Sequence, residues 1–166
     1  VVTEFRVRPG DTVAAGQTLA VLSSPEVGAA RAKIKRRQAD LQLAQRQAEW
    51  QTNIRDGVTL LVQLIREKKE PQEIDAALQY RAVGDYRERL VSAYTRVRLA
   101  NIMADNIREA ATAGAISGKV RQERESERQA SQASLQSAIE QSIFDVEQLS
   151  REATAKSEDA TRQLEV

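Results

Sequence analysis

The strongest constraint on this chain is a seam of small and apolar residues that recurs in alternating steps of three and four along residues 83–114. Such a seam is typical of a coiled coil, because it keeps one narrow face turned towards a partner helix over many turns. Several seam positions carry alanine, which lets the partner approach closely. The seam comprises Val83, Tyr86, Leu90, Ala93, Val97, Ala100, Ala104, Ile107, Ala111 and Gly114.

Two further apolar stripes lie on either side of this seam and predict additional long helices. Residues 121–134, which lie within the downstream helical region, are nearly all polar and offer little apolar area to bury. The upstream stripe comprises Ile34, Leu41, Ala44, Ala48, Val58, Leu61, Val62 and Ile65, interrupted by Arg37, Gln51 and Arg55. The downstream stripe comprises Leu135, Ile139, Val146, Leu149, Ala153 and Ala160.

Composition excludes several kinds of site. The 166 residues are 30% charged and 4% aromatic, which favours solvated helices over a thick aromatic core. Because the chain has neither Cys nor His, it cannot build a zinc finger, an iron–sulfur cluster, a thiol nucleophile or a His-based triad. We therefore expect no catalytic residues, no cofactor and no metal site. No apolar stretch is long enough to cross a bilayer, so any membrane anchor is expected outside this sequence.

The first 22 residues predict two short β-strands around a turn at Pro9-Gly10, where Gly10 tolerates a positive φ. Strands this short need more strands or a packed helix to bury a face. A helix is expected next, because Ser23 or Ser24 can act as N-cap and Pro25 suits the first turn. Ser23 with Glu26 also has the spacing of a capping box.

The string VRPGDTVAAGQTLAVLSSPEV resembles the first half of the biotinyl/lipoyl hammerhead, on its V-x-PGD-x-V-x-x-GQ-x-L pattern. The first lysine is Lys33, so the modifiable lysine of carrier domains is missing from its usual place. A half-hammerhead interrupted there by helices resembles the periplasmic adaptor subunits, or membrane fusion proteins, of tripartite efflux pumps and type I secretion systems. The Ser-Pro-Glu-Val junction is similar to the adaptors of heavy-metal efflux systems. The resemblance implies a second half-hammerhead beyond Val166.

These observations predict a mainly α fold, in which a long antiparallel coiled-coil hairpin is attached to a partial lipoyl-type β-hammerhead. We expect the β part at residues 1–24, a first helical arm at 25–113 with an interruption at 67–72, a tip at 114–118, and a truncated second arm at 119–166. Folding at residue 116 places Val166 opposite Arg66. A three-helix bundle folded back at Pro71 ranks second. Gly57 and Gly84 are expected to be weak points inside helices.

The tip is the predicted partner-binding site. Gly114 suits the end of one helix and Ser117 the cap of the next. In the adaptor family the tip ends in Ile-Ser or Val-Ser, which Ile116-Ser117 matches, whereas the family's preceding Arg and Leu positions fall on Asn106 and Ala110. The predicted contact residues are Arg108, Ala115, Ile116, Ser117, Lys119 and Arg121.

The resemblance implies a non-catalytic adaptor in the periplasm of a Gram-negative cell envelope. Its expected partners are an outer-membrane TolC-type channel, an inner-membrane transporter of the RND or ABC type, and further copies of itself. A structural coiled-coil scaffold without a transport role is the alternative. An enzyme carrier subunit ranks third, because it requires a lipoylated or biotinylated lysine.

Two groups of charges have simpler explanations than a ligand site. The basic run at residues 31–37 points around the whole helix and lacks aromatic partners, so a solvated surface is favoured over nucleic acid. Glutamates and arginines alternate along residues 121–128, and ion pairs at spacings of three or four explain them better than metal binding.

Overall fold

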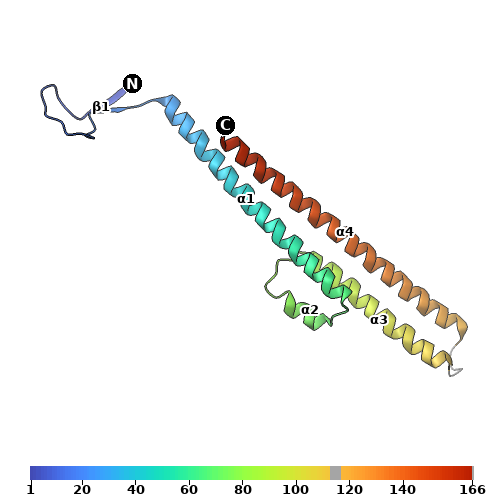
Figure 1. The fold of residues 1–166 in the computed structure, drawn as a ribbon. Helices are drawn as coiled ribbons and strands as arrows, with labels where there is room; N and C mark the ends of the chain where they lie inside the picture. Colours follow the sequence, from blue (N-terminus) through green and yellow to red (C-terminus); the bar gives the residue numbers. More distant parts are fainter. Residues whose placement is uncertain (113–116, 166) are drawn as a thin grey trace.

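The computed structural model describes the backbone of residues 1–112 and 117–165 and the side chains of residues 1–110 and 117–165. Two short strands come first, and helices make up most of the rest (Figure 1). The prediction of a mainly α fold is confirmed. The elements are β1 (Val2–Phe5), β2 (Ala20–Leu22), α1 (Pro25–Arg66), α2 (Pro71–Ala77), α3 (Tyr86–Thr112) and α4 (Gly118–Glu165).

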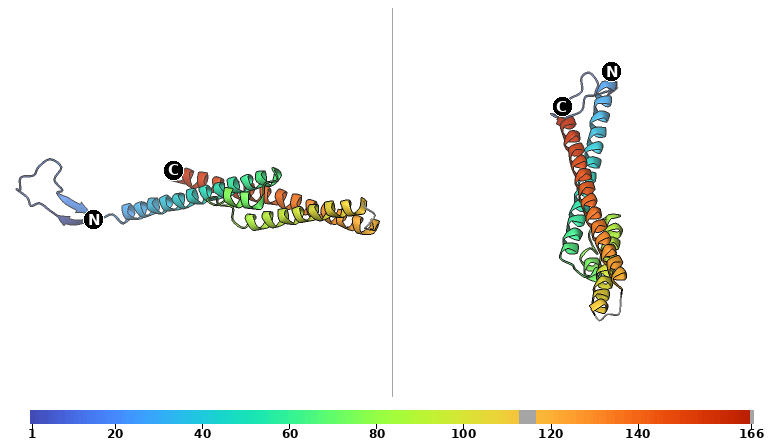
Figure 2. Two further views of the ribbon diagram at one scale, coloured as in Figure 1. Left: turned by 90° about the horizontal axis from the view of Figure 1, so that it is seen from below. Right: turned by 90° about the vertical axis from the view of Figure 1, so that its right-hand side faces the viewer.

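The three long helices form a slender rod, with α4 antiparallel to both α1 and α3 (Figures 1 and 2). Polar contacts between the helices show which residues of α4 lie beside which residues of α1 and α3. Gln132 on α4 bonds Asn101 on α3, and Arg37 on α1 donates to the carbonyl of Gln163 near the end of α4. The expected pairing of Val166 with Arg66 is therefore wrong, because the neighbouring Gln163 lies beside Arg37.

The pairing shifts because the chain leaves the rod after α1. Residues 67–85, which contain α2, form an excursion on one side of the rod, and α3 then begins beside the last turns of α1 rather than beyond them (Figure 1). The long helices α1, α3 and α4 have 42, 27 and 48 residues, and α1 and α3 each lie mainly against α4. The described chain therefore does not form the folded-back bundle of three helices of similar length.

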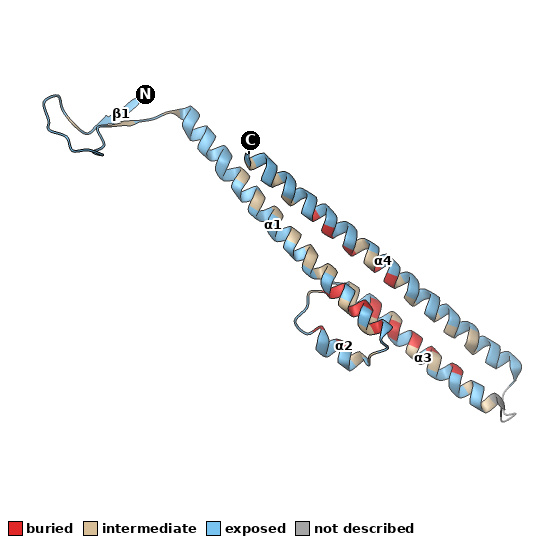
Figure 3. Ribbon diagram, in the orientation of Figure 1, coloured by how far each residue is buried: buried red, intermediate tan, exposed pale blue. Residues whose placement is uncertain are grey.

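The core is concentrated where α1, α2, α3 and α4 meet, which we call the node (residues 54–65, 74–94 and 135–146; Figure 3). Leu61, Ile74, Leu78 and Leu90 are completely buried there. Full burial of each such side chain contributes roughly 1.5–3 kcal/mol, so the node is the main source of tertiary stability. On either side of the node the rod is two helices thick and its buried residues are sparse, and the first turns of α1 extend beyond the end of α4 (Figure 1).

The predicted stripes are partly right. Leu90, Val97, Ala100 and Ala104 of the seam are buried. On α4, however, Leu149 is 42% exposed, and the serines Ser142 and Ser150 are buried instead. On α1, Ile34 is 51% exposed. Small buried residues at these α4 positions let the helices approach closely, which apolar periodicity alone does not reveal.

The end of α1 is closed by its own backbone. Lys68 lies in the left-handed region at φ 56°, its N–H donates to Ile65, and the N–H of Lys69 donates to Leu64. This pair of bonds is a Schellman motif, which satisfies the last carbonyls of the helix. A capping box between Glu70 and Glu73, with Pro71 in the first turn, then starts α2.

The β1–β2 pair is antiparallel and joined by a loop with two tight turns. In each turn a glycine has a positive φ, Gly10 at 100° and Gly16 at 86°, so the expectation for Gly10 is confirmed. In each turn, the side chain of the fourth residue also accepts a hydrogen bond from the backbone N–H of the first. Asp11 accepts from the N–H of Arg8, and Gln17 accepts from the N–H of Ala14. The PGD and GQ segments of the sequence thus fold as matching turns.

Two local expectations need correction. Of the two predicted caps, Ser24 is confirmed, because its side chain accepts a hydrogen bond from the N–H of Val27. The capping box expected between Ser23 and Glu26 is wrong, because the N–H of Ser23 donates to the carbonyl of Val1 beside the strands. Gly84 is not inside a helix, since it lies before α3 with φ 59°. Ser23 belongs to the β pair and Gly84 belongs to the excursion, although the sequence patterns placed both at or within a helix.

Candidate partner-binding site

The end of the rod farthest from the strands is formed by the last turns of α3 and the first turns of α4, and we call it the turn end (residues 104–112 and 117–129). Ser117 caps α4 there, because its Oγ accepts a hydrogen bond from the N–H of Val120 at 3.5 Å. The predicted capping role of Ser117 is confirmed. Of the other predicted contact residues, Ala115 and Ile116 lie outside the described residues, as does Gly114.

A hollow of about 610 Å³ lies between α3 and α4 at the turn end. Arg108 of α3 and Arg121 of α4 both line it, together with Gln122 and Glu125. Lys119 does not line the hollow and lies nearer the start of α4. The fold therefore brings two of the predicted cations together across the helix pair and leaves the third apart.

Most cations at the turn end are paired within their own helix. Arg108 lies 3.7 Å from Asp105, Lys119 lies 4.0 Å from Glu123, and Arg124 lies 2.6 Å from Glu127. The prediction that the glutamates of this segment pair with neighbouring arginines is confirmed for Glu125 and Glu127, whereas Glu123 pairs with Lys119. These exposed pairs stabilise the helices by at most about 1 kcal/mol each.

Arg121 differs from these cations. Its side chain makes no ion pair within the described part of the chain, and only its backbone N–H is bonded, to the carbonyl of Ser117. An exposed guanidinium at the mouth of a hollow can donate two parallel hydrogen bonds to a carboxylate. Among the described cations of the turn end, Arg121 is thus the best placed to contact an external acidic group.

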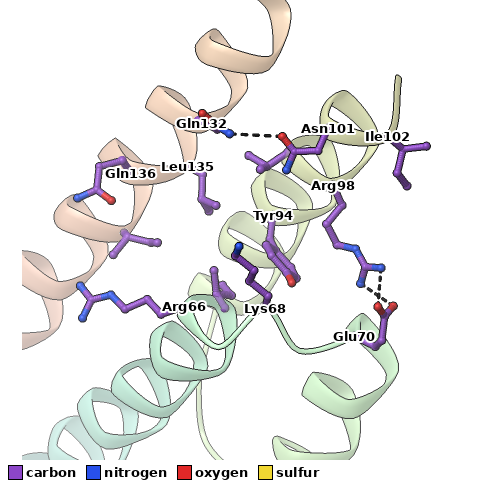
Figure 4. Close-up of a pocket in the computed structure, with 13 residues that line it drawn as sticks. Arg66, Lys68, Glu70, Tyr94, Arg98, Asn101, Ile102, Gln132, Leu135 and Gln136 are labelled. Atoms are coloured by element: carbon purple, nitrogen blue, oxygen red, sulfur yellow. Dashed lines mark hydrogen bonds and ion pairs between the residues drawn. The ribbon is translucent and has the colours of Figure 1, made fainter. Parts of the chain in front are cut away.

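A second polar cluster lies beside the node and was missed by the sequence patterns (Figure 4). Arg98 contacts both carboxylate oxygens of Glu70, at 2.6 and 2.7 Å, and lies over the ring of Tyr94. The hydroxyl of Tyr94 donates to the carbonyl of Lys69 at 2.9 Å. These contacts hold the start of the excursion against α3.

Electrostatics follow this geometry. The hydrogen bond from Arg98 holds the pKa of Glu70 below its usual value, and the same bond raises the pKa of the Arg98 guanidinium. Burial raises the pKa of Tyr94. The only sequence signal for this cluster is the spacing of four between Tyr94 and Arg98, and such a spacing does not identify Glu70, which lies 28 positions from Arg98.

No family model, curated protein or solved structure matches this chain. We therefore infer its function from its own residues and their geometry.

Two kinds of feature are absent from the described residues. No group of three or more aspartates, glutamates, cysteines or histidines is placed to hold a metal ion in the described ranges. None of the helices described is long and apolar enough to cross a membrane. The same residues form a rod with a packed node and a hollow lined by charged side chains at the turn end.

Proposed function

We propose that this chain is part of a periplasmic adaptor that links an inner-membrane transporter to an outer-membrane exit duct without catalysis. In this proposal α1, α3 and α4 form a coiled-coil hairpin, and β1 and β2 belong to the first half of a lipoyl-type hammerhead. The duct is a TolC-type channel, the transporter is of the RND or ABC type, and several copies of the chain surround the duct.

The observation that carries the proposal is the shape of the rod. Helix α4 runs for 48 residues without interruption, which corresponds to about 72 Å at 1.5 Å per residue. It lies antiparallel to α1 and α3, so the turn end is held far from the strands (Figure 1). A helix pair of this length suits a spacer between two partners better than it suits a chemical reaction.

The strands at the other end support the same proposal. Phe5 is 74% exposed and Leu22 is 71% exposed, although both lie in strands. Two strands of four and three residues are too short to bury these side chains alone. An exposed apolar face of this kind is expected where further strands of the same β domain pack in the intact adaptor.

The turn end is the proposed contact with the duct. Ala115, Ile116 and Ser117 would supply the central contact, and Arg108, Lys119 and Arg121 would surround it with positive charge. Each copy would make a modest contact, and several copies bound to one duct would strengthen it by avidity.

The decisive experiment measures binding of the parent adaptor to the purified duct by surface plasmon resonance. An Ile116→Asp, Ser117→Arg variant should bind at least about tenfold more weakly, because it places opposite charges at the centre of the contact. A matched control, Lys156→Asp with Glu158→Arg, makes similar charge changes at exposed positions of α4 far from the turn end. Unchanged duct binding by the tip variant would contradict the proposed contact and favour the scaffold alternative.

A further inference from the structure

The surface of the node has an open groove where α1 stops and α3 and α4 continue (Figure 4). Its volume is about 540 Å³, within the range of small-molecule sites. The floor is apolar and is supplied by all three long helices, through Ile65, Val97, Leu135 and Ile139. The groove lies where α1 would continue if it were longer. Because the Schellman motif ends that helix, the apolar residues of α3 and α4 beyond its end stay uncovered.

The rim of this groove is positively charged. Arg66 and Lys68, at the end of α1, both line it. Within the described residues neither side chain has an ion-pair or hydrogen-bond partner, whereas Arg98 is neutralised by Glu70. Two uncompensated cations therefore stand at one edge of an apolar floor.

The groove is closed on the side towards the turn end. The amide of Gln132 on α4 donates to Asn101 on α3 at 3.3 Å and bridges the two helices (Figure 4). On the opposite side the last turn of α1 blocks it. A partner helix continuing along the rod would meet both barriers, so the space suits a short, flexible molecule better than a helix.

We propose that this groove binds a single-chain amphipathic anion, a molecule with one carboxylate or similar headgroup and an alkyl chain. The headgroup pairs with Arg66 and Lys68, and the chain covers Ile65, Leu135 and Ile102, which also lines the groove and is 55% exposed. Charge and apolar area are both required, because exposed ion pairs alone contribute little. This site is independent of the duct contact proposed above.

The test is titration calorimetry of the chain with dodecanoate below its micelle-forming concentration. Dodecyl maltoside serves as the neutral compound with a chain of nearly the same length, and acetate as the anion without a long chain. Saturable binding is expected for dodecanoate, with at least about tenfold weaker binding of the other two. Amide NMR shifts on binding should be largest around Ile65, Lys68 and Leu135.

Variants assign the binding to this groove. Arg66→Gln with Lys68→Gln should weaken dodecanoate binding about tenfold, and Ile102→Gln should weaken it several-fold. Lys35→Gln with Arg36→Gln removes the same charge from exposed positions of α1 away from the groove and should leave binding within about twofold. Circular dichroism checks that each variant folds. Equal binding of dodecyl maltoside, equal loss in both double variants, or no saturable binding of dodecanoate by the folded protein would overturn the proposal.

Discussion

Lys68 is the residue whose backbone conformation is least suited to its side chain. It is the only non-glycine residue with a positive φ in the described part of the chain. The Schellman motif requires that conformation, and glycine adopts it without the steric cost that a Cβ brings. The chain therefore retains local strain at the point where it leaves the rod, beside the cationic rim of the groove.

Replacing Lys68 by glycine should relieve this strain. We expect Lys68→Gly to raise the free energy of unfolding by about 0.5–1 kcal/mol, measured by urea denaturation monitored by circular dichroism. Lys69→Gly is the matched control. Lys69 has no positive φ, so glycine there adds only freedom to the unfolded chain and should lower the free energy of unfolding. Shifts of the same sign in both variants would contradict the strain at Lys68.

At the scale of elements, Gly57 fixes how the excursion packs on α1. A Cβ at this position would overlap the carbonyl oxygen of Ala82, and that oxygen belongs to the backbone. The next residue, Val83, is buried in the node. Absence of a side chain at Gly57 therefore allows the excursion to return against the helix, so this glycine is a contact site and not only the weak point expected from its propensity.

Gly57→Ala separates these two roles. Helix propensity alone predicts a gain of about 1 kcal/mol, whereas the clash with Ala82 predicts a loss of about 1–3 kcal/mol, and we expect the loss to win. Gly28→Ala in the same helix is the control, because a Cβ there would meet no other atom within 4 Å. It should raise the free energy of unfolding by about 0.5–1 kcal/mol. Denaturation curves in which Gly57→Ala is as stable as Gly28→Ala would disprove the close packing.

At the scale of the whole molecule, the excursion changes which parts of the rod lie side by side. Towards the turn end, Asn101 lies opposite Gln132, as a simple fold at residue 116 expects. Beyond the node, Gln163 lies opposite Arg37, far from Arg66. The difference between the two pairings is made up by the residues of the excursion and by the stretch of α3 that lies beside the end of α1. A compact node thus sits within an otherwise two-helix rod.

Distances between spin labels test this arrangement directly, because the chain has no native cysteine. Labels at Arg36→Cys and Gln163→Cys should lie close together in pulsed electron paramagnetic resonance. Labels at Arg66→Cys and Gln163→Cys should lie roughly 45 Å apart, since about 30 residues of helix separate the two α1 positions. The opposite order of distances would mean that the two arms pair without the excursion.

The sequence specifies the features that depend on close neighbours along the chain. Ser117 as a helix cap, the turn at Gly10 and the buried seam residues Leu90, Val97, Ala100 and Ala104 all follow from residues a few positions apart, whose bonds or spacing act locally. The partner role of the tip stays a prediction.

The tertiary structure decides where the rod thickens and how α1 is aligned on α4. These features depend on Gly57 meeting Ala82, on Tyr94 reaching Lys69 and on Arg98 reaching Glu70, between residues 25 or more positions apart. A stripe of small residues such as alanine and serine can pair with several positions along another helix with a similar gain in buried area. Periodicity therefore does not choose among these pairings. The contacts at the node favour the alignment that the structure shows, because a Cβ at Gly57 would overlap the backbone of Ala82 where the excursion returns to α1.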